Sequence, residues 1–387
     1  MTATVTVSAK GAERARARHC WIYRSDLLDT GKAQPGAVVR VTGPGREVLG
    51  SALYSSRSQI ALRFVSFDAS GIDADFWRSR LAAAEKLREQ VVGDRTAYRL
   101  VYGESDLLPS LIVDRYGDCL AIQTLSQGMD ALKQMWIDLL AERYSPRAIV
   151  ERNEARVREL EGLPRQARVV YGDAPSELIV EEGGVKMAVD LVHGQKTGSF
   201  LDQSENRIAS GRYARGRALD CFAFQGGFAL HLARRADRVT AIDSSDAAIA
   251  GARRNAEING LTNIDFVEGN VFDILRELES AGERFDTIVL DPPAFAKSRG
   301  SVEAARRGYK EINLRAIKLL TSGGTLISST CSYHISEIEF LNLISEAAAD
   351  ARRSVRLVEK RMQSRDHPVL ISMPETYYLK CMILSVD

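Results

Sequence analysis

A regular alternation of strand-like and helix-like segments, from residue 217 to residue 386, constrains the fold more than any other feature of this sequence. Short apolar segments rich in β-branched residues predict strands at 217–222, 238–242, 264–267, 285–290, 324–330, 354–360 and 376–386. Amphipathic segments between them predict helices, for example 226–235, 245–259, 303–320 and 336–349. Such alternation is typical of a doubly wound, mostly parallel sheet, into which the last strand could insert antiparallel, because no helix follows it.

The preceding regions have different patterns and predict two further domains. Residues 1–70 are rich in Val, Thr, Gly and Ser and carry turn signals at Pro35 and Pro44, which predicts a small β-barrel domain. Residues 71–190 mix helical and strand patterns, as in an α+β middle domain. The expected fold class is therefore α/β overall, with the doubly wound, Rossmann-like sheet in residues 191–387.

Composition excludes several classes of protein. No apolar run approaches the length of a membrane span, and the first residues resemble no secretion signal. The five cysteines are widely spread and form no CxxC pair, which favours neither a zinc site nor a disulfide scaffold. We therefore expect a cytoplasmic protein that has no bound metal and no membrane partner.

The distribution of charge hints at a polyanionic partner. The net charge is +1, but residues 1–68 contain ten Lys or Arg against five Asp or Glu. Within them, the segment from Arg14 to Trp21 is basic and ends in aromatic residues, a combination that suits RNA backbone and bases. A solvated basic face with Trp21 in the core explains the same residues equally well.

The first predicted strand of the α/β domain ends at Asp220 and is followed by a turn that reaches Gly226. A dinucleotide site needs a glycine-rich turn in which pyrophosphate approaches the helix N-terminus. Here Phe222 and Phe224 would block that approach, and Asp220 would repel phosphate. The turn instead favours a cationic ligand without phosphate, such as S-adenosylmethionine.

The next two predicted strands also end in polar residues. Asp243 stands where a carboxylate can bind both hydroxyls of a ribose, and Asn270 follows the third strand, where it could meet adenine. Each residue alone could equally be a helix cap. Their occurrence on three successive strand ends favours a nucleoside site.

A fourth strand end carries the residues expected to react. The apolar run 285–290 ends in Asp291-Pro292-Pro293, and the following predicted strand ends in Cys331. Ligands bind outside the carboxyl ends of the strands in open α/β sheets. We therefore hypothesise that Asp291 and Cys331 face one flipped-out base.

Together these residues resemble a known family. The stretch from Asp220 to Gly226, with Asp243, Asp291-Pro292-Pro293 and Thr330-Cys331-Ser332, looks like the motif series of class I S-adenosylmethionine-dependent methyltransferases, and most closely that of the RlmI-like bacterial rRNA cytosine-5 methyltransferases. The resemblance covers nearly the whole chain. It implies an N-terminal PUA domain, S-adenosylmethionine as cofactor and 23S (large-subunit) rRNA as substrate. A homodimer is a further possibility.

The resemblance also carries over residues before the first sheet strand. In the family this segment lines the cofactor pocket, so it implies cofactor contacts by Phe200 and Gln203, with Lys196 as a weaker candidate. The expected cofactor set then comprises Phe200, Gln203, Asp220, Phe222, Gly226, Asp243, Asn270 and Asp291.

Cytosine-5 methylation defines chemical roles for the reactive pair. A cysteine thiolate must add to C6 of the base, because carbon 5 alone is a poor nucleophile. We expect a helix that begins just after Cys331 to favour the thiolate, with help from Lys297, Arg299 or His334. Asp291 could protonate N3 as a general acid.

Residues next to Asp291 are expected to bind the substrate. The carbonyl groups of Pro292 and Pro293 can accept from the exocyclic amine, and Phe295 either stacks on the base or packs in the core. Lys297 begins a basic stretch that continues through residues 299–318, which suits phosphates or, alternatively, forms an exposed helix face. Ala294 occupies the position at which many RNA cytosine-5 methyltransferases carry a second cysteine, so the resemblance is to the single-cysteine branch.

Other functions remain open from the sequence. Asp-Pro-Pro sites also serve methylation of guanine or of an exocyclic amine, in which case Cys331 is dispensable. A catalytically silent RNA-binding assembly factor is a third alternative, against which the complete set of strand-end residues argues. A dehydrogenase is disfavoured by the turn before Gly226.

Overall fold

The computed structural model describes residues 2–69, 71–194, 197–296 and 299–387. The chain forms two compact units. The first comprises residues 1–180, 189–201 and 365–376, and the second comprises residues 181–188, 202–364 and 377–387. None of the helices in the described ranges is both long and apolar enough to cross a membrane.

The first unit begins with a six-stranded sheet in the order β2-β6-β5-β4-β1-β3. Its core is formed by apolar residues that alternate along these strands, such as Val39 and Val41, which are fully buried. The basic segment from Arg14 to Trp21, for which RNA binding and a solvated face were both open, runs from the end of helix α1 to the start of strand β2. The elements are β1 (Thr4–Val7), α1 (Ala9–Arg16), β2 (Trp21–Tyr23), β3 (Leu27–Asp29), β4 (Val38–Thr42), β5 (Val48–Tyr54) and β6 (Ile60–Ser66).

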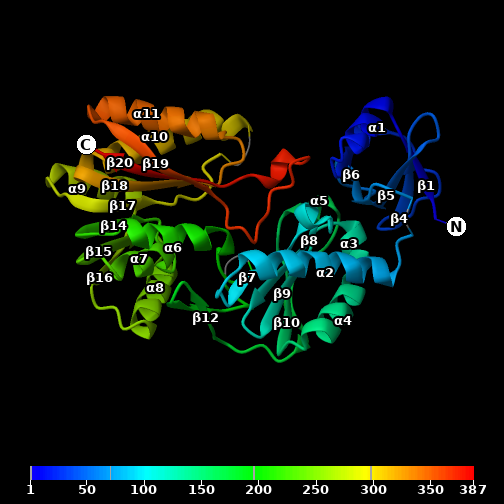
Figure 1. Cartoon of the computed structure of the whole chain (residues 1–387), viewed down its shortest axis with the longest axis horizontal. Coiled ribbons are helices and arrows are strands. Elements are labelled where there is room, and N and C mark those ends of the chain that lie inside the picture. The colour runs from blue at the N-terminus through cyan, green and yellow to red at the C-terminus, as the bar shows by residue number, and fades with distance from the viewer. Residues whose placement is uncertain (1, 70, 195–196, 297–298) are drawn as a thin grey trace. The chain divides into compact units, whose positions relative to one another are not determined.

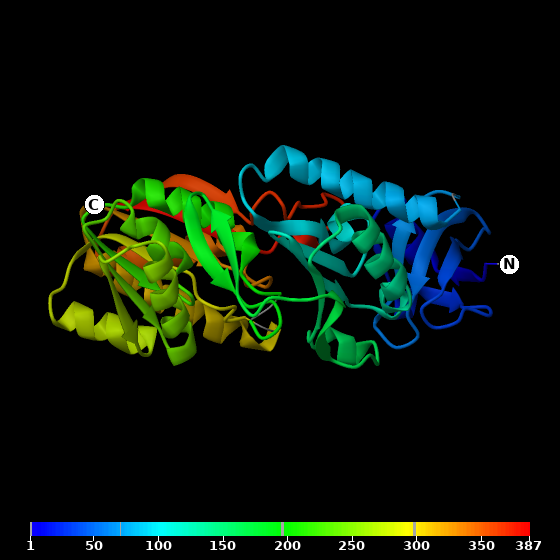
Figure 2. The ribbon, with the colours of Figure 1, turned by 90° about the horizontal axis from the view of Figure 1, so that it is seen from below.

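A five-stranded sheet in the order β11-β10-β9-β8-β7 follows in the same unit. Helix α2 is a single long helix that lies beside this sheet (Figure 2), and Asp73 is its N-cap. The strands are β7 (Ala97–Tyr102), β8 (Leu111–Tyr116), β9 (Cys119–Thr124), β10 (Ala148–Asn153) and β11 (Gln166–Gly172). The helices are α2 (Ala74–Val91), α3 (Gln127–Ala131), α4 (Lys133–Tyr144) and α5 (Val157–Leu160).

The second unit contains the predicted alternation of strands and helices (Figure 1). A hairpin of β12 (Leu178–Glu182) and β13 (Val185–Val189) precedes it. The strands of the large sheet are β14 (Arg217–Cys221), β15 (Arg238–Asp243), β16 (Ile264–Glu268), β17 (Phe285–Leu290), β18 (Leu320–Thr330), β19 (Val355–Met362) and β20 (Lys380–Val386). The helices are α6 (Ser204–Tyr213), α7 (Gly227–Ala233), α8 (Asp246–Ile258), α9 (Val271–Ser280), α10 (Val302–Leu319) and α11 (Glu337–Ala351).

The order of strands in the large sheet is β16-β15-β14-β17-β18-β20-β19. Strands β14 to β18 pair in parallel, which confirms the predicted doubly wound sheet. Strand β20 inserts antiparallel between β18 and β19, as the absence of a following helix suggested. From β14, successive strands are added toward one side of the sheet as far as β16, and from β17 they are added toward the other side. In open α/β sheets, the ligand crevice lies at the carboxyl ends of the strands at such a switch point.

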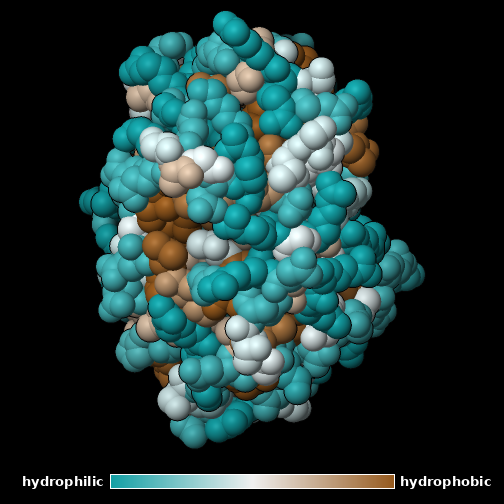
Figure 3. All heavy atoms as spheres, turned by 90° about the vertical axis from the view of Figure 1, so that its left-hand side faces the viewer, coloured by the Kyte–Doolittle hydropathy of each residue, from teal (hydrophilic) through white to brown (hydrophobic). Residues whose placement is uncertain are grey.

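Both faces of this sheet are covered by helices (Figure 1). Buried residues of α9, α10 and α11 pack on one face, and buried residues of α6 and α7 pack on the other. Helix α6 was not predicted, because it precedes the first predicted strand and its apolar residues do not gather on one face. In Figure 3, one face of the molecule is largely hydrophilic, and its hydrophobic residues gather in patches.

Candidate functional site

The turn between β14 and α7 is shaped by backbone conformations that side chains seldom adopt. Phe222 and Phe224 have φ values of 65° and 48°, and Gly226 has φ 79°. A Cβ atom added at Gly226 would lie 3.1 Å from the Cβ of Ala252, so the turn fits closely over α8. Left-handed non-glycine residues are costly, and they cluster at ligand sites.

Asp220 lies beneath this turn and is fully buried. Its Oδ2 accepts from the backbone N–H of Ala229, which ties the strand end to α7. Its Oδ1 has no hydrogen-bond partner among the described residues. Burial, together with the nearby carboxylates of Asp291 and Asp243, raises the pKa of Asp220 well above its ordinary value. A buried, unpartnered carboxyl oxygen of this kind fits a cationic group of a bound ligand.

Asp243 and Asn270 end the next two strands in different ways. The carboxylate of Asp243 accepts from the N–H of Phe224 at 2.8 Å and from the N–H of Ser245 at 3.0 Å, so it braces the first turn. Asn270 is the N-cap of α9, and its Oδ1 accepts from the N–H of Phe272. Asn270 is therefore a helix cap, which was one of the two roles that the sequence left open for it. Its side-chain amide can also contact a ligand.

Gln203 reaches the strand end that carries Asp291. Its Nε2 donates to Oδ1 of Asp291 at 2.6 Å, while its Oε1 accepts from Nδ2 of Asn206, also at 2.6 Å. Nε of Arg361 donates to Oδ1 of Asn206 at 2.9 Å. Because a guanidinium group can only donate, this chain of contacts fixes the orientation of both amides and directs the Gln203 N–H at Asp291. Phe200, the other residue carried over from this segment, is partly buried and belongs to the first unit.

Arg207 is a buried cation near this site that sequence reasoning missed. Its guanidinium makes a two-pronged ion pair with Glu182, with contacts of 2.7 and 2.6 Å, and its charge also acts on Asp291. A Cβ atom at Gly227 would lie 2.6 Å from Cδ of Arg207, so the arginine packs directly against the start of α7. No local pattern marks Arg207, because its partner comes from the hairpin.

The loop after Asp291 is joined to the loop that carries Cys331. Oγ of Ser332 accepts from the N–H of Ala296 at 3.2 Å and lies 2.9 Å from the hydroxyl oxygen of Tyr309. Thr330 donates to the same Tyr309 hydroxyl at 2.8 Å. The side chains on either side of Cys331 therefore both bond to Tyr309 of α10, which fixes the backbone at the cysteine. Strands β17 and β18 are parallel neighbours, so both loops lie at the same edge of the sheet.

Cys331 differs from the other cysteines in its exposure. All five are free, and Cys331 alone is not buried. Burial raises the pKa of Cys20 and of Cys381 to about 12, and burial raises the pKa of Cys221 well above its ordinary value. These three thiols are therefore inert under ordinary conditions.

The helix predicted at 336–349 is present as α11, and its N-terminus comes several residues after Cys331 in the chain. Helix α11 begins at Glu337, and its N-cap Ser336 accepts from the N–H of Glu339, so a loop separates the thiol from the helix. Among the described residues, Lys380 on β20 is a cation that lies beside the cysteine loop. Sequence reasoning missed it, because residue 380 meets residue 330 only through the antiparallel insertion of β20.

Phe295 packs within a cluster of aromatic rings. Its centroid lies 4.7 Å from that of Tyr309 and 5.9 Å from that of Phe272, and Phe222 joins the same cluster at 6.3 Å. This arrangement favours the packing role for Phe295 over stacking on a base. Pro292 is buried and Pro293 is exposed. Lys297, which was expected to bind substrate, lies outside the described residues, as does Lys196.

The basic stretch on α10 is mostly neutralised, contrary to the expectation of a free phosphate-binding face. Acidic residues of α9, α10 and α11 pair with Arg306, Lys310, Arg315 and Lys318. Among the described basic residues of α10, Arg307 alone has no ion pair, and it is exposed. The alternative of an ordinary helix face therefore describes α10 better.

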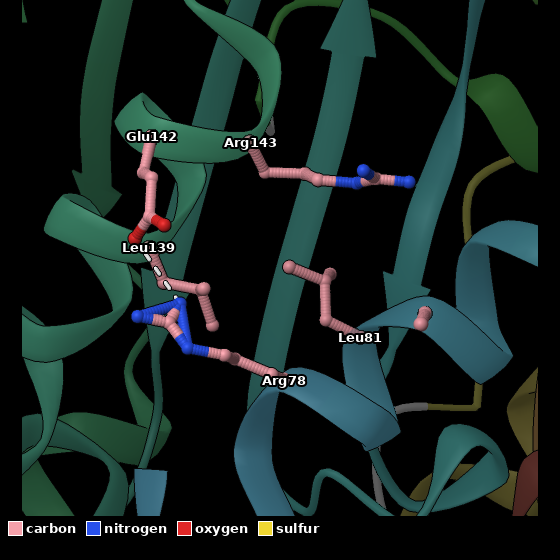
Figure 4. Close-up of a pocket in the computed structure, with 6 residues that line it drawn as sticks. Arg78, Leu81, Leu139, Glu142 and Arg143 are labelled. Atoms are coloured by element: carbon pink, nitrogen blue, oxygen red, sulfur yellow. Dashed lines mark hydrogen bonds and ion pairs between the residues drawn. The ribbon is translucent and has the colours of Figure 1, made fainter. Parts of the chain in front are cut away.

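A separate surface pocket of about 410 Å³ lies in the first unit (Figure 4). It is formed between α2 and α4, and an ion pair of 3.1 Å joins Arg78 to Glu142 within it. None of the sequence-predicted site residues lines this pocket. In the described part of the chain, no group of three or more His, Cys, Asp or Glu could hold a metal ion.

Two family models match the chain. That of PUA-like domains matches residues 5–67, and that of S-adenosylmethionine-dependent methyltransferases matches residues 166–377. Ribosomal RNA large subunit methyltransferase I of Aliivibrio fischeri is 40% identical over 384 residues, which cover 96% of each chain. The protein of the same name from Shewanella amazonensis is 39% identical and covers 95% of this chain and 96% of its own.

Solved structures share the fold. A Streptococcus mutans protein assigned as a SAM-dependent methyltransferase aligns over 100% of both chains with a TM-score of 0.83 and 20% identity. A chain assigned as a methyltransferase and complexed with SAH aligns over the same share with a TM-score of 0.85 and 20% identity.

Proposed function

The chain belongs to the S-adenosylmethionine-dependent methyltransferase family, and from this premise we propose that it methylates carbon 5 of a cytosine in large-subunit ribosomal RNA. Relatives of about 40% identity that carry the name of a large-subunit rRNA methyltransferase support the substrate class. The PUA-like domain supports an RNA partner. The base and its atom are inferred from the chemistry of the site.

The observation that carries the proposal is the position of Cys331. It is the one cysteine that is not buried, and it follows β18 directly, at the sheet edge where Asp291 follows β17. Methylation of an exocyclic amine or of guanine needs no thiol at that edge. Methylation of carbon 5 of a pyrimidine needs one, because the ring must first be activated by addition at C6.

S-adenosylmethionine, when bound, supplies the methyl group as an electrophile and keeps the electron pair of the broken sulfur–carbon bond on its sulfur. We propose that Asp220 holds its cationic part and that Asp243 holds the ribose hydroxyls. The unpartnered Oδ1 of Asp220 fits the first role. Phe200, Phe222, Gly226 and Asn270 are proposed to shape the rest of the cofactor site.

The residues of the chain then act on the base in a defined order. The Cys331 thiolate forms a bond to C6, and the electron pair of the C5–C6 double bond forms a double bond between C4 and C5. The electron pair of the N3–C4 double bond moves to N3, which takes a proton from Asp291. Carbon 5 uses its electron pair to take the methyl group. A base then removes the C5 proton, and the electron pair of that bond re-forms the C5–C6 double bond. The thiolate leaves C6 with the electron pair of the carbon–sulfur bond, and N3 returns its proton to Asp291. Because Ala294 provides no side-chain base, we assign the removal of the C5 proton to a water molecule.

Orientation of Asp291 is the proposed role of Gln203. Its 2.6 Å contact with Oδ1 of Asp291 holds the carboxyl group in place, and the chain of amides behind it sets which end of Gln203 faces Asp291. The carbonyl groups of Pro292 and Pro293 are proposed to accept from the exocyclic amine of the cytosine, since neither residue has an N–H. Lys297 is proposed to contact the RNA backbone.

Nucleoside analysis of methylated RNA tests the function. The purified protein is incubated with S-adenosylmethionine and unmodified large-subunit rRNA, and the digested RNA is examined by mass spectrometry. We expect 5-methylcytidine with the wild-type protein and with Cys381→Ala, and a loss of at least about a hundredfold in rate with Cys331→Ala. The Cys381 variant is the matched control, because that cysteine is buried on the neighbouring strand β20.

Two results would contradict the proposal. A methylated guanine or N4-methylcytidine made equally well by Cys331→Ala would indicate chemistry at another atom. RNA binding without methyl transfer by the wild-type protein, under conditions in which S-adenosylmethionine binds, would indicate an assembly factor.

A further inference from the structure

Lys380 is a lysine in an unusual place. It begins β20 and is only 3% exposed. Its Nζ lies 3.2 Å from the carbonyl oxygen of Tyr378 and 3.5 Å from that of Ser332. A buried ammonium is costly unless its charge is compensated, so the position calls for an explanation.

No carboxylate among the described residues forms an ion pair with Lys380. The carboxylate whose charge acts on it is Glu337, and Glu337 is engaged elsewhere. One oxygen of Glu337 accepts from Lys360 at 2.9 Å, and the other accepts from the Tyr377 hydroxyl at 2.7 Å. The charge of Lys380 is therefore left without a close anionic partner from the folded core.

The group that Lys380 does approach is the loop that carries Cys331. In the antiparallel register, Lys380 is paired with Thr330, the residue before the cysteine. Its ammonium bonds to the carbonyl of Ser332, the residue after the cysteine. The side chain therefore passes beside Cys331, and the ionised thiol is an anion that acts on Lys380 together with Glu337.

We propose that Lys380 is the residue that holds Cys331 as a thiolate, ready to add to its substrate. The inference rests on the proposed function, because it assigns a partner to the proposed nucleophile. Lys380 acts through Cys331 and is therefore a positioning residue. It replaces the helix N-terminus that the sequence suggested.

Other ionisable groups surround the pair and set the sign of the effect. Tyr309 of α10 bonds to the side chains on either side of Cys331, and burial raises the pKa of Tyr309, so it stays neutral. Glu337 at the start of α11 opposes the effect of Lys380 on the thiol, but its charge is largely met by Lys360. The ring centroid of Tyr377 lies 5.4 Å from Nζ of Lys380, and burial raises the pKa of the Tyr377 hydroxyl. His334 lies on the same loop as Cys331. Among the described residues, Lys380 is thus a cation whose removal should disfavour the thiolate.

The reaction of Cys331 with iodoacetamide tests this inference without RNA or cofactor. Alkylation is followed from pH 5.5 to pH 9, and the modified peptide is quantified by mass spectrometry with Cys331→Ala as the blank. Because only the thiolate reacts, we expect alkylation of Lys380→Met to be about tenfold slower at pH 7 than that of wild type. Its pH profile should move to higher pH by about one unit.

Matched variants separate charge from structure. Lys380→Arg keeps the cation and should follow the wild-type profile. Lys360→Met removes a neighbouring lysine that is 54% exposed and pairs with Glu337, and it should move the profile of Cys331 by far less than Lys380→Met. If Lys380→Met does not fold, as judged by its circular dichroism, Lys380→Gln is measured in its place.

Coinciding profiles for wild type and the neutral Lys380 variant would overturn the inference. The outcome is separable from that of the proposed function. If Cys331→Ala still methylated RNA, the function would fail while the alkylation profiles still reported on Lys380. If Cys331 were essential but its alkylation did not depend on Lys380, the function would stand and this inference would fall.

Discussion

At the scale of single residues, the site is organised by three carboxylates that share one sheet edge but differ in their surroundings. Asp220 is fully buried with one unpartnered oxygen, Asp243 is held by two backbone N–H groups, and Asp291 is held by Gln203. Burial and like charges raise the pKa of Asp220, so this carboxylate is hard to ionise in the free protein. A cationic ligand would relieve that cost.

This arrangement predicts a pH dependence of cofactor binding. As the pH falls through the raised pKa of Asp220, the carboxyl becomes protonated and loses its attraction for the cationic ligand. We expect the affinity for S-adenosylhomocysteine, measured by calorimetry between pH 7.5 and pH 5.5, to fall by up to about tenfold per pH unit. Asp220→Asn should bind weakly at every pH. The exposed Asp246→Asn should behave as wild type, and a wild-type affinity independent of pH would contradict the prediction.

The sequence could place Asp220, Asp243, Asp291 and Cys331 because each stands at the carboxyl end of a recognisable apolar strand. It could not place Tyr309, Arg207 or Lys380. These three reach the site from α10, α6 and β20, and their meeting with it depends on how distant segments pack. It also left a phosphate-binding face on α10 open, because most acidic partners of that helix come from α9 and α11 and cannot be seen locally.

At the scale of elements, the turn from β14 to α7 is the most constrained segment of the cofactor site. Gly226 combines a positive φ with a close approach to Ala252 of α8. Gly260, at the end of α8, has φ +64° but nothing within 4 Å of an added Cβ atom. A comparison of Gly226 with Gly260 therefore distinguishes the cost of backbone strain, which both positions have, from the cost of a steric contact, which only Gly226 has.

We expect Gly226→Ala to cost more free energy of unfolding than Gly260→Ala. Backbone strain should cost each variant about 1 kcal/mol, and the contact with Ala252 should add about 1 kcal/mol more to the first. Urea unfolding measures both variants. Only Gly226→Ala should also weaken S-adenosylhomocysteine binding, and equal costs with equal affinities would show that the turn is not constrained as described.

Most strands and helices of the second unit could be predicted, because their periods are regular. The position of β20 was harder, since an antiparallel insertion depends on pairing with both β18 and β19. That insertion has a functional consequence. It brings Lys380 to the end of β18, where the proposed nucleophile lies.

At the scale of the whole molecule, the chain divides into two units, whereas the sequence predicted domains at 1–70, 71–190 and 191–387. The largest departure is the segment 365–376, which belongs to the first unit. Contacts of Asp366 explain why this segment belongs to the first unit. Its carboxylate is buried, its Oδ1 lies 3.3 Å from Nη1 of Arg95, and its Oδ2 accepts from the backbone N–H of Arg99. Local sequence cannot reveal an ion pair between residues so far apart in the chain.

The central claim is that Cys331 forms a covalent bond to C6 of a cytosine during methyl transfer. The most direct test uses rRNA that contains 5-fluorocytidine, with S-adenosylmethionine present. Fluorine at C5 cannot leave as a proton does, so the adduct should persist. We predict a denaturation-resistant protein–RNA complex with wild type and with Cys381→Ala, and none with Cys331→Ala. Robust methyl transfer to normal rRNA by Cys331→Ala, or an adduct that this variant still forms, would contradict the account.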